Sequence, residues 1–159
     1  SVGLVGSEMC IRDSISCATH CPYENFVNPK TVGQIAKDLF EMGCYEISLG
    51  DTTGKGTPEQ TLEVVKECLK YLSADKLAGH FHDTYQNALD NINVCLENGI
   101  KTFDASVGGL GGCPYSPGAK GNVATEKVNK LLLSKGYETH LDRDKLKECS
   151  VIAQKLILN

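Results

Sequence analysis

Two histidines that alternate along a β-prone segment form the clearest chemical pattern in this sequence. Residues 77–82 read LAGHFH, and Asp83 follows directly. Side chains two positions apart on a strand point to the same face, so His80 and His82 can offer two imidazoles to one metal ion. The alternative is a pair of half-buried polar residues without a ligand. The spacing, and the position at the end of a strand, favour a metal site.

A glycine-rich loop is the second candidate. Residues 108–121 follow a predicted strand and contain six glycines and two prolines. Long loops of this kind often act as lids over a site. Cys113, at the centre of the loop, has two interpretations of equal weight. It is either an acid/base or nucleophilic thiol, or an incidental cysteine in a flexible loop.

Three further polar residues stand beside predicted strands. Asn122 opens a helix, and the residue type favours an N-cap over a carbonyl ligand to a hard metal ion. Asp51 could bind a substrate hydroxyl or act as a base, although a solvated turn residue is the slightly favoured interpretation. Ser48 precedes it on the same strand, and we expect it to share the face that this strand presents to a site.

Hydrophobic periodicity places these residues on alternating strands and helices. Strands are predicted at 15–19, 44–50, 77–82 and 101–107, with a helix after each and one more at the C-terminal end. Asn28-Pro29 and the Thr57–Gln60 capping box mark the first two helix starts, and the last two helices are predicted at 123–133 and 142–158. This order indicates parallel strands with crossover helices, either in an open doubly wound sheet or in part of a (β/α)8 barrel.

The composition is that of a globular α/β chain. The 159 residues are 41% hydrophobic and 23% charged, with a net charge of −4, which argues against nucleic-acid and membrane partners. No apolar run approaches the roughly 20 residues of a membrane span. Three of the eight cysteines, Cys44, Cys68 and Cys95, lie in apolar periodic segments, which indicates reduced thiols in a cytoplasm-like compartment.

We expect residues 1–14 to be a non-native leader. The segment SVGLVGSEMCIRDS has no clear period and no capping residues, and it resembles a translated sequencing adapter. The predicted domain therefore spans residues 15–159, and Arg12-Asp13 is not interpreted as a catalytic pair.

Four motifs together resemble the 3-hydroxy-3-methylglutaryl-CoA lyase family. They are SCATHCPYE (16–24), GCYEISLGDTTGKGTP (43–58), HFHDTYQNAL (80–89) and GGLGGCPYSPGAKGNVATE (108–126), in the family's order. The resemblance implies cleavage of 3-hydroxy-3-methylglutaryl-CoA into acetoacetate and acetyl-CoA. It also implies a divalent metal (Mg²⁺ or Mn²⁺), an acyl-CoA substrate and a homodimer for the full-length parent.

The same resemblance implies roles for individual residues. His80, His82 and Asn122 are similar to the family's metal ligands, and His80 could also carry a proton. Cys113 matches the catalytic cysteine of the family's loop. Asp51 and Ser48 match residues that line its substrate pocket.

The family's first barrel strand carries an Arg-Asp pair that has no counterpart in this chain. We therefore expect the C-terminal half of a (β/α)8 barrel, strands 5–8, followed by a C-terminal helix, and we expect it to be inactive alone. A related metal-dependent aldolase, a 2-isopropylmalate- or homocitrate-type acyl synthase, and a non-catalytic self-associating barrel fragment are the alternatives. The expected compartment is the cytoplasm, with the mitochondrial matrix as the alternative.

Overall fold

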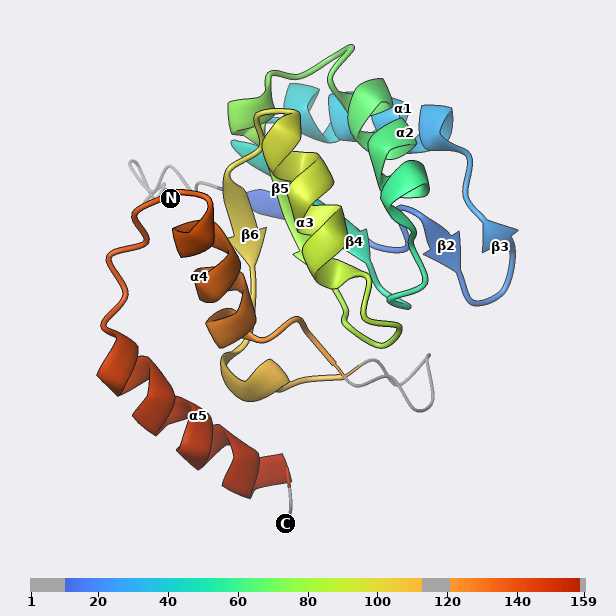
Figure 1. Ribbon diagram of the computed structural model, residues 1–159. Coiled ribbons are helices and arrows are strands. Elements are labelled where there is room, and N and C mark those ends of the chain that lie inside the picture. The colour runs from blue at the N-terminus through green and yellow to red at the C-terminus, as the bar shows by residue number, and fades with distance from the viewer. Residues whose placement is uncertain (1–10, 113–120, 158–159) are drawn as a thin grey trace, which may run out of the picture.

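Four parallel strands form the main sheet of this chain (Figure 1). The computed structural model describes residues 11–112 and 121–157. The sheet has the order β1-β4-β5-β6, and each neighbouring pair is parallel. Its strands are β1 (Arg12–Ile15), β4 (Glu46–Asp51), β5 (Leu77–Phe81) and β6 (Thr102–Asp104).

Five helices follow the strands along the chain. They are α1 (Pro29–Glu41), α2 (Pro58–Cys68), α3 (Ala88–Glu97), α4 (Thr125–Ser134) and α5 (Arg143–Ile157). Two 3₁₀ turns, η1 (Ala74–Lys76) and η2 (Val107–Gly109), and a two-stranded hairpin of β2 (His20–Cys21) and β3 (Asn25–Phe26) complete the described elements. In this part of the chain, no helix has both the length and the apolar character needed to cross a membrane.

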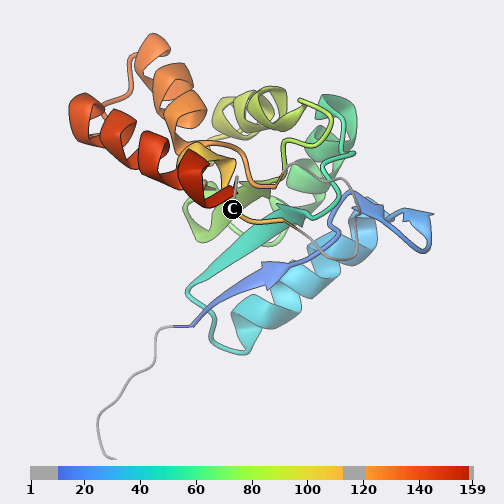
Figure 2. The same cartoon turned by 90° about the horizontal axis from the view of Figure 1, so that it is seen from below.

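The strand order separates the two predicted architectures. The strands are neighbours in the order in which they occur along the chain, so right-handed crossovers place all connecting helices on one face of the sheet. Accordingly, α1 packs on α2, α2 on α3 and α3 on α4. Figure 2 shows β1 and β4 side by side with α1 lying along them. An open doubly wound sheet would carry helices on both faces.

A contact across the other face shows that the sheet is curled. Arg12 on the first strand donates a hydrogen bond to Asp104 on the last strand, with 3.0 Å between Nη1 and Oδ2. Two strands lie between them in the sheet, so these side chains meet only over a concave surface. A concave parallel sheet covered by helices on its convex face is the architecture of a (β/α)8 barrel, of which this chain forms four strands.

The first two predicted helix starts are confirmed. The Asn28 side chain accepts a hydrogen bond from the backbone of Lys30, and Pro29 occupies the first helical position of α1. At α2, Thr57 and Gln60 form a reciprocal capping box. These local signals fix where each helix leaves the strand that precedes it.

The first strand lies three residues earlier than predicted. It runs over Arg12–Ile15 and pairs in register with Glu46–Leu49, so it includes residues that the sequence pattern assigns to the leader. Cys17 has a φ of 57°, and this left-handed conformation turns the chain away from the sheet before the predicted end of the strand. The segment that follows forms the small hairpin of β2 and β3.

The other boundaries shift by smaller amounts. The strand predicted at 101–107 is shortened to Thr102–Asp104, because the chain beyond it turns into η2. The helix predicted at 123–133 begins at Thr125. The hydrophobic core fills the space between the convex face of the sheet and the helices, with Ile47, Leu77 and Ile92 completely buried.

Candidate metal and substrate site at the strand ends

One carboxylate oxygen organises the concave face of the sheet. Oδ2 of Asp104 accepts hydrogen bonds from Nη1 of Arg12 at 3.0 Å and from Oγ of Ser48 at 3.1 Å. The same oxygen lies 3.1 Å from Nδ1 of His80. Residues from β1, β4 and β5 therefore converge on an acid from β6.

The surroundings of Asp104 keep its side chain ionised. The hydrogen bond from His80, with the hydrogen bond and positive charge of Arg12, lowers the pKa of Asp104 to about 2 against the opposing effect of burial. Arg12 in turn contacts Glu46 through its Nε atom, so the guanidinium is held between two carboxylates. This network joins the first, second and last strands of the sheet.

The two predicted histidines lie together. Their ring centroids are 5.6 Å apart, and the rings are tilted by 43°. His82 is 7% exposed, and burial together with the nearby His80 lowers its pKa, which favours a neutral imidazole. Its Nδ1 atom is buried without a hydrogen-bond partner in the described structure. An unpartnered buried nitrogen in a neutral ring is suited to an external ligand.

Asn122 lies beside His82, and it does not cap a helix. It forms an isolated antiparallel bridge with His82, while the N-cap of α4 is Ala124. The preference for an N-cap at Asn122 is therefore wrong, because the chain remains extended beside β5 for two more residues before the helix begins. Nδ2 of Asn122 donates to the carbonyl oxygen of Leu110 at 2.9 Å. This bond fixes the side chain and leaves its oxygen for another contact.

A pocket of about 560 Å³ opens over these residues. Its lining comes from the two histidines, from the residues that follow β1, from the hairpin and from the end of β4. Its described lining residues are Ser14, Ser16, Cys17, Cys21, Pro22, Tyr23, Gly50, Thr52, His80, His82 and Gly112. The pocket therefore lies at the carboxyl ends of the strands, where barrel proteins place their sites.

Asp51 and Ser48 lie on opposite faces of β4. The expectation that they share a face is wrong, because three residues separate them and side chains alternate along a strand. Oδ1 of Asp51 accepts from Thr19 and Oδ2 accepts from the backbone of Gly56, both at 3.0 Å, and only 1% of the residue is exposed. The interpretation as a solvated turn residue is therefore also wrong. Burial raises the pKa of Asp51, while these hydrogen bonds oppose the shift.

Ser48 is completely buried beneath the pocket, where it contacts Asp104. The structure therefore brings His80, His82 and Asn122 together, places Ser48 one layer below them and separates Asp51 from them. Cys113, the predicted catalytic cysteine, lies outside the described residues.

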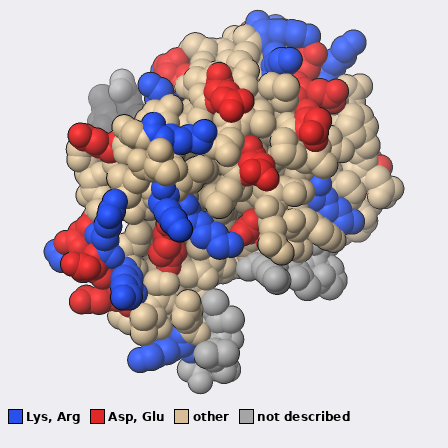
Figure 3. All heavy atoms as spheres, in the orientation of Figure 1, with Lys and Arg blue, Asp and Glu red and all other residues tan. Residues whose placement is uncertain are grey.

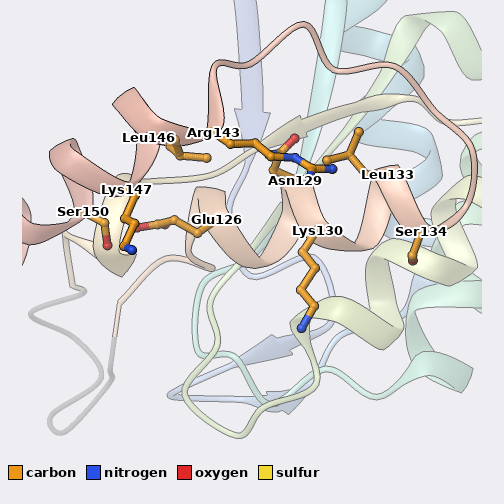
Figure 4. Close-up of a pocket in the computed structure, with 9 residues that line it drawn as sticks. All are labelled: Glu126, Asn129, Lys130, Leu133, Ser134, Arg143, Leu146, Lys147 and Ser150. Carbon is orange, nitrogen blue, oxygen red and sulfur yellow. The ribbon is translucent and has the colours of Figure 1, made fainter.

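A second groove lies between α4 and α5, away from the pocket over the histidines. It measures about 610 Å³ and includes Lys130, Arg143 and Lys147 among its lining residues. Figure 4 shows the Lys130 side chain extending away from Arg143, so the cationic ends do not converge on one point. Figure 3 shows acidic and basic side chains mixed over the same helices. This groove has the character of a solvated helix surface.

The donor atoms at the pocket fit a divalent metal ion. Among residues 11–112 and 121–157, no group of three or more His, Cys, Asp or Glu side chains is placed to hold a metal ion. Nδ1 of the buried His82 has no hydrogen-bond partner in the described structure, so it is suited to bind a ligand. His80 and Asn122 lie beside His82 and would add nitrogen and oxygen donors, a mixture that suits several divalent ions.

Sequence reasoning missed Asp104 and Arg12. An acid in the middle of the predicted strand KTFDASV was the available signal for Asp104, because acids with restricted access to solvent usually have partners. Arg12 could not be found in the same way, since its partner is 92 positions away in the sequence.

Fold and site together define part of a (β/α)8-barrel protein with a candidate metal site at the carboxyl ends of its strands. The family model described as HMGL-like matches residues 8–152, and the chain belongs to this family. Hydroxymethylglutaryl-CoA lyase of Pseudomonas mevalonii is 48% identical over 141 residues, which cover 89% of this chain and 47% of that protein. Lyases from Arabidopsis thaliana, named mitochondrial, and from Danio rerio, named cytoplasmic, are 50% and 49% identical.

Solved structures of HMG-CoA lyases also resemble this chain. The HMG-CoA lyase of Brucella melitensis superposes with a TM-score of 0.91 at 49% identity, covering 94% of this chain and 53% of that one. An HMG-CoA lyase from Acinetobacter baumannii in complex with coenzyme A and 3-methylmalate matches at 34% identity, with a TM-score of 0.81, over 87% of this chain and 46% of that one. The chain thus spans about half the length of these relatives.

Proposed function

We propose that this chain is the C-terminal half of the barrel of a lyase that cleaves 3-hydroxy-3-methylglutaryl-CoA into acetoacetate and acetyl-CoA. The observation that carries the proposal is the grouping of His80, His82 and Asn122 at the strand ends in a chain of the HMGL-like family. The complex of a related lyase with coenzyme A supports an acyl-CoA as the substrate class.

The proposed metal ligands are His80, His82 and Asn122, and Mg²⁺ or Mn²⁺ is the proposed ion. When bound, a divalent cation eases loss of the tertiary hydroxyl proton and stabilises the negative charge that develops as the carbon–carbon bond breaks. His80 is held at Nδ1 by Asp104, so its other ring nitrogen is available to the pocket. Cys113, which lies outside the described residues, remains a proposed proton donor.

Asp51 and Ser48 act indirectly in this proposal. Asp51 fixes the turn that carries Thr52 to the rim of the pocket, through its bonds to Thr19 and Gly56. Ser48 supports Asp104 from below. Both residues therefore shape the substrate pocket without direct exposure to it.

The test uses two proteins. We expect the 159-residue chain alone to show only background cleavage of 3-hydroxy-3-methylglutaryl-CoA, because the residues described here form one side of a barrel. A chimaera carries residues 11–157, which include the whole of β1, in place of the matching segment of the Pseudomonas mevalonii lyase, and we expect it to release acetoacetate with Mg²⁺ or Mn²⁺. Cleavage by the chain alone at the rate of the chimaera would contradict the first expectation.

Replacement of His82 by Ala in the chimaera should lower cleavage by more than the roughly 10–100-fold that loss of an outer-shell partner costs. His140→Ala is the matched control, because His140 lies in the segment between α4 and α5 and is absent from the pocket lining. A chimaera that condenses acetyl-CoA with a 2-oxo acid and fails to cleave the lyase substrate would favour the acyl synthase alternative.

Compartment and assembly belong to the same proposal. Among the described cysteines, Cys21, Cys44, Cys68, Cys95 and Cys149 form no disulfide, as a reducing compartment favours. We propose the cytoplasm, although relatives carry both cytoplasmic and mitochondrial names. We propose a homodimer for the full-length protein, to be tested by light scattering of the chimaera.

A further inference from the structure

Asp104 lies outside the proposed ligand set, yet three donors from three different strands meet at one of its oxygens. Arg12, Ser48 and His80 approach Oδ2 at 3.0, 3.1 and 3.1 Å. A carboxylate with this many partners cannot rotate without breaking several of them. Its position is therefore fixed by the curvature of the whole sheet, and that position determines where the His80 ring can lie.

We propose that Asp104 is a positioning residue that fixes the tautomer and orientation of His80 and thereby directs its Nε2 atom into the metal pocket. This inference rests on the proposed function, since it deepens the assignment of the same site.

The chemistry of the contact sets the tautomer. An ionised carboxylate has only acceptor atoms, so a hydrogen bond to Nδ1 of His80 requires a proton on that nitrogen. In a neutral ring the lone pair then resides on Nε2. Metal-bound histidines usually donate their second ring nitrogen to a carboxylate or carbonyl, which fixes the ring and raises its basicity as a ligand.

The two histidines differ in this respect. His80 has a carboxylate partner at Nδ1, whereas Nδ1 of His82 is buried without a hydrogen-bond partner in the described structure. Asp104 therefore contacts only one of the two rings, that of His80.

The first measurement needs no metal. Nitrogen-15 NMR of the metal-free chain reports which ring nitrogen of His80 is protonated, and we expect the Nδ1–H tautomer in the unmodified protein. Asp104→Ala should abolish this preference. Asp104→Asn should keep it, because the donors of Arg12 and Ser48 require an oxygen at the Oδ2 position and an asparagine can present one.

The second measurement is Mn²⁺ affinity by titration calorimetry. We expect Asp104→Ala to weaken binding about 10–100-fold, and Asp104→Asn to weaken it less. Asp75→Ala is the matched control, since it removes the same charge from an exposed side chain on η1 and should leave both measurements unchanged. The amide spectrum of Asp104→Asn verifies that the fold is retained.

The outcomes are distinguishable. If the His80 tautomer and the Mn²⁺ affinity are both the same in Asp104→Ala as in the unmodified protein, the positioning role is wrong. If the unmodified protein binds no Mn²⁺, the proposed metal site fails, while the tautomer measurement still decides whether Asp104 controls His80. Loss of the tautomer together with weaker Mn²⁺ binding supports the proposal.

Discussion

At the scale of single residues, burial determines how reactive each cysteine thiol of this chain is. Cys68 and Cys95 are completely buried, and burial raises the pKa of each thiol to about 12. The thiolate is the reactive form, so at pH 8 almost none of either thiol is ionised. Both cysteines therefore act as small hydrophobic side chains of the core.

The difference in exposure between these two buried cysteines and the exposed Cys149 predicts selective alkylation. Under native conditions at pH 8, N-ethylmaleimide should modify the exposed Cys149 and leave Cys68 and Cys95 unmodified, as measured by mass spectrometry of the peptides. Urea should remove the protection, because unfolding returns both thiols to water and to their ordinary pKa. Rapid native labelling of Cys68 would show that α2 is not packed as described.

Chemistry at single positions was partly predictable from the sequence. The spacing of His80 and His82 gives a shared face directly, because the period of a strand is two. The same period, applied to Ser48 and Asp51, gives opposite faces, as the structure has them. Asn122 was ambiguous, since an asparagine before a helix fits both a cap and a ligand, and only the bridge to His82 decides its place.

At the scale of elements, the start of α2 shows how local sequence fixes a helix. Oγ1 of Thr57 accepts from the backbone of Gln60, and the Gln60 side chain accepts from the backbone of Thr57. Pro58 fills the first helical position, where no backbone donor is needed. All of these residues lie within four positions of one another, so the sequence was sufficient to predict this boundary.

The capping box predicts a measurable loss of stability. Thr57→Ala should lower the free energy of unfolding by about 1 kcal/mol, because a backbone donor of the first turn loses its acceptor. Thr57→Ser keeps the hydroxyl and should stay close to the unmodified protein. Urea denaturation followed by circular dichroism measures both, and equal losses for Ala and Ser would argue against the cap as the cause.

Other boundaries depend on contacts that no local pattern contains. The first strand occupies Arg12–Ile15 because these residues pair with β4, more than thirty positions along the chain. The β-prone residues that follow are turned out of the sheet at Cys17, which has a positive φ. Local propensity could therefore predict that a strand exists here, whereas its register required the neighbouring strand.

At the scale of the whole molecule, curvature is the property that sequence patterns left open. The alternation of strands and helices fits a flat doubly wound sheet and a barrel equally well. The monotonic strand order and the contact between Arg12 and Asp104 decide for the barrel. Both are relations between elements, so they become visible only when all four strands are placed.

The Arg12 contacts predict a stability effect larger than that of a surface ion pair. The side chains of Arg12 and Asp104 are 24% and 30% exposed, and Arg12→Met removes the ion-pair partner of Glu46 and one of the three partners of Asp104. We expect a loss of about 1–3 kcal/mol in the free energy of unfolding, measured by urea denaturation. Lys37→Met breaks an exposed pair with Glu41 and should cost less than about 1 kcal/mol. Equal losses would contradict a structural role for Arg12.

The contact between the first and last strands also bears on cooperativity. Four similar strand–helix units that touch mainly their neighbours resemble a short repeat array, which can fray from either end. Arg12 and Asp104 belong to opposite ends of this array, so opening either end breaks the same ion pair. The two terminal units are thereby coupled, and local unfolding at one end removes protection from the other. Amide hydrogen exchange in β1 and β6 should therefore occur at similar rates, as in one cooperative unit.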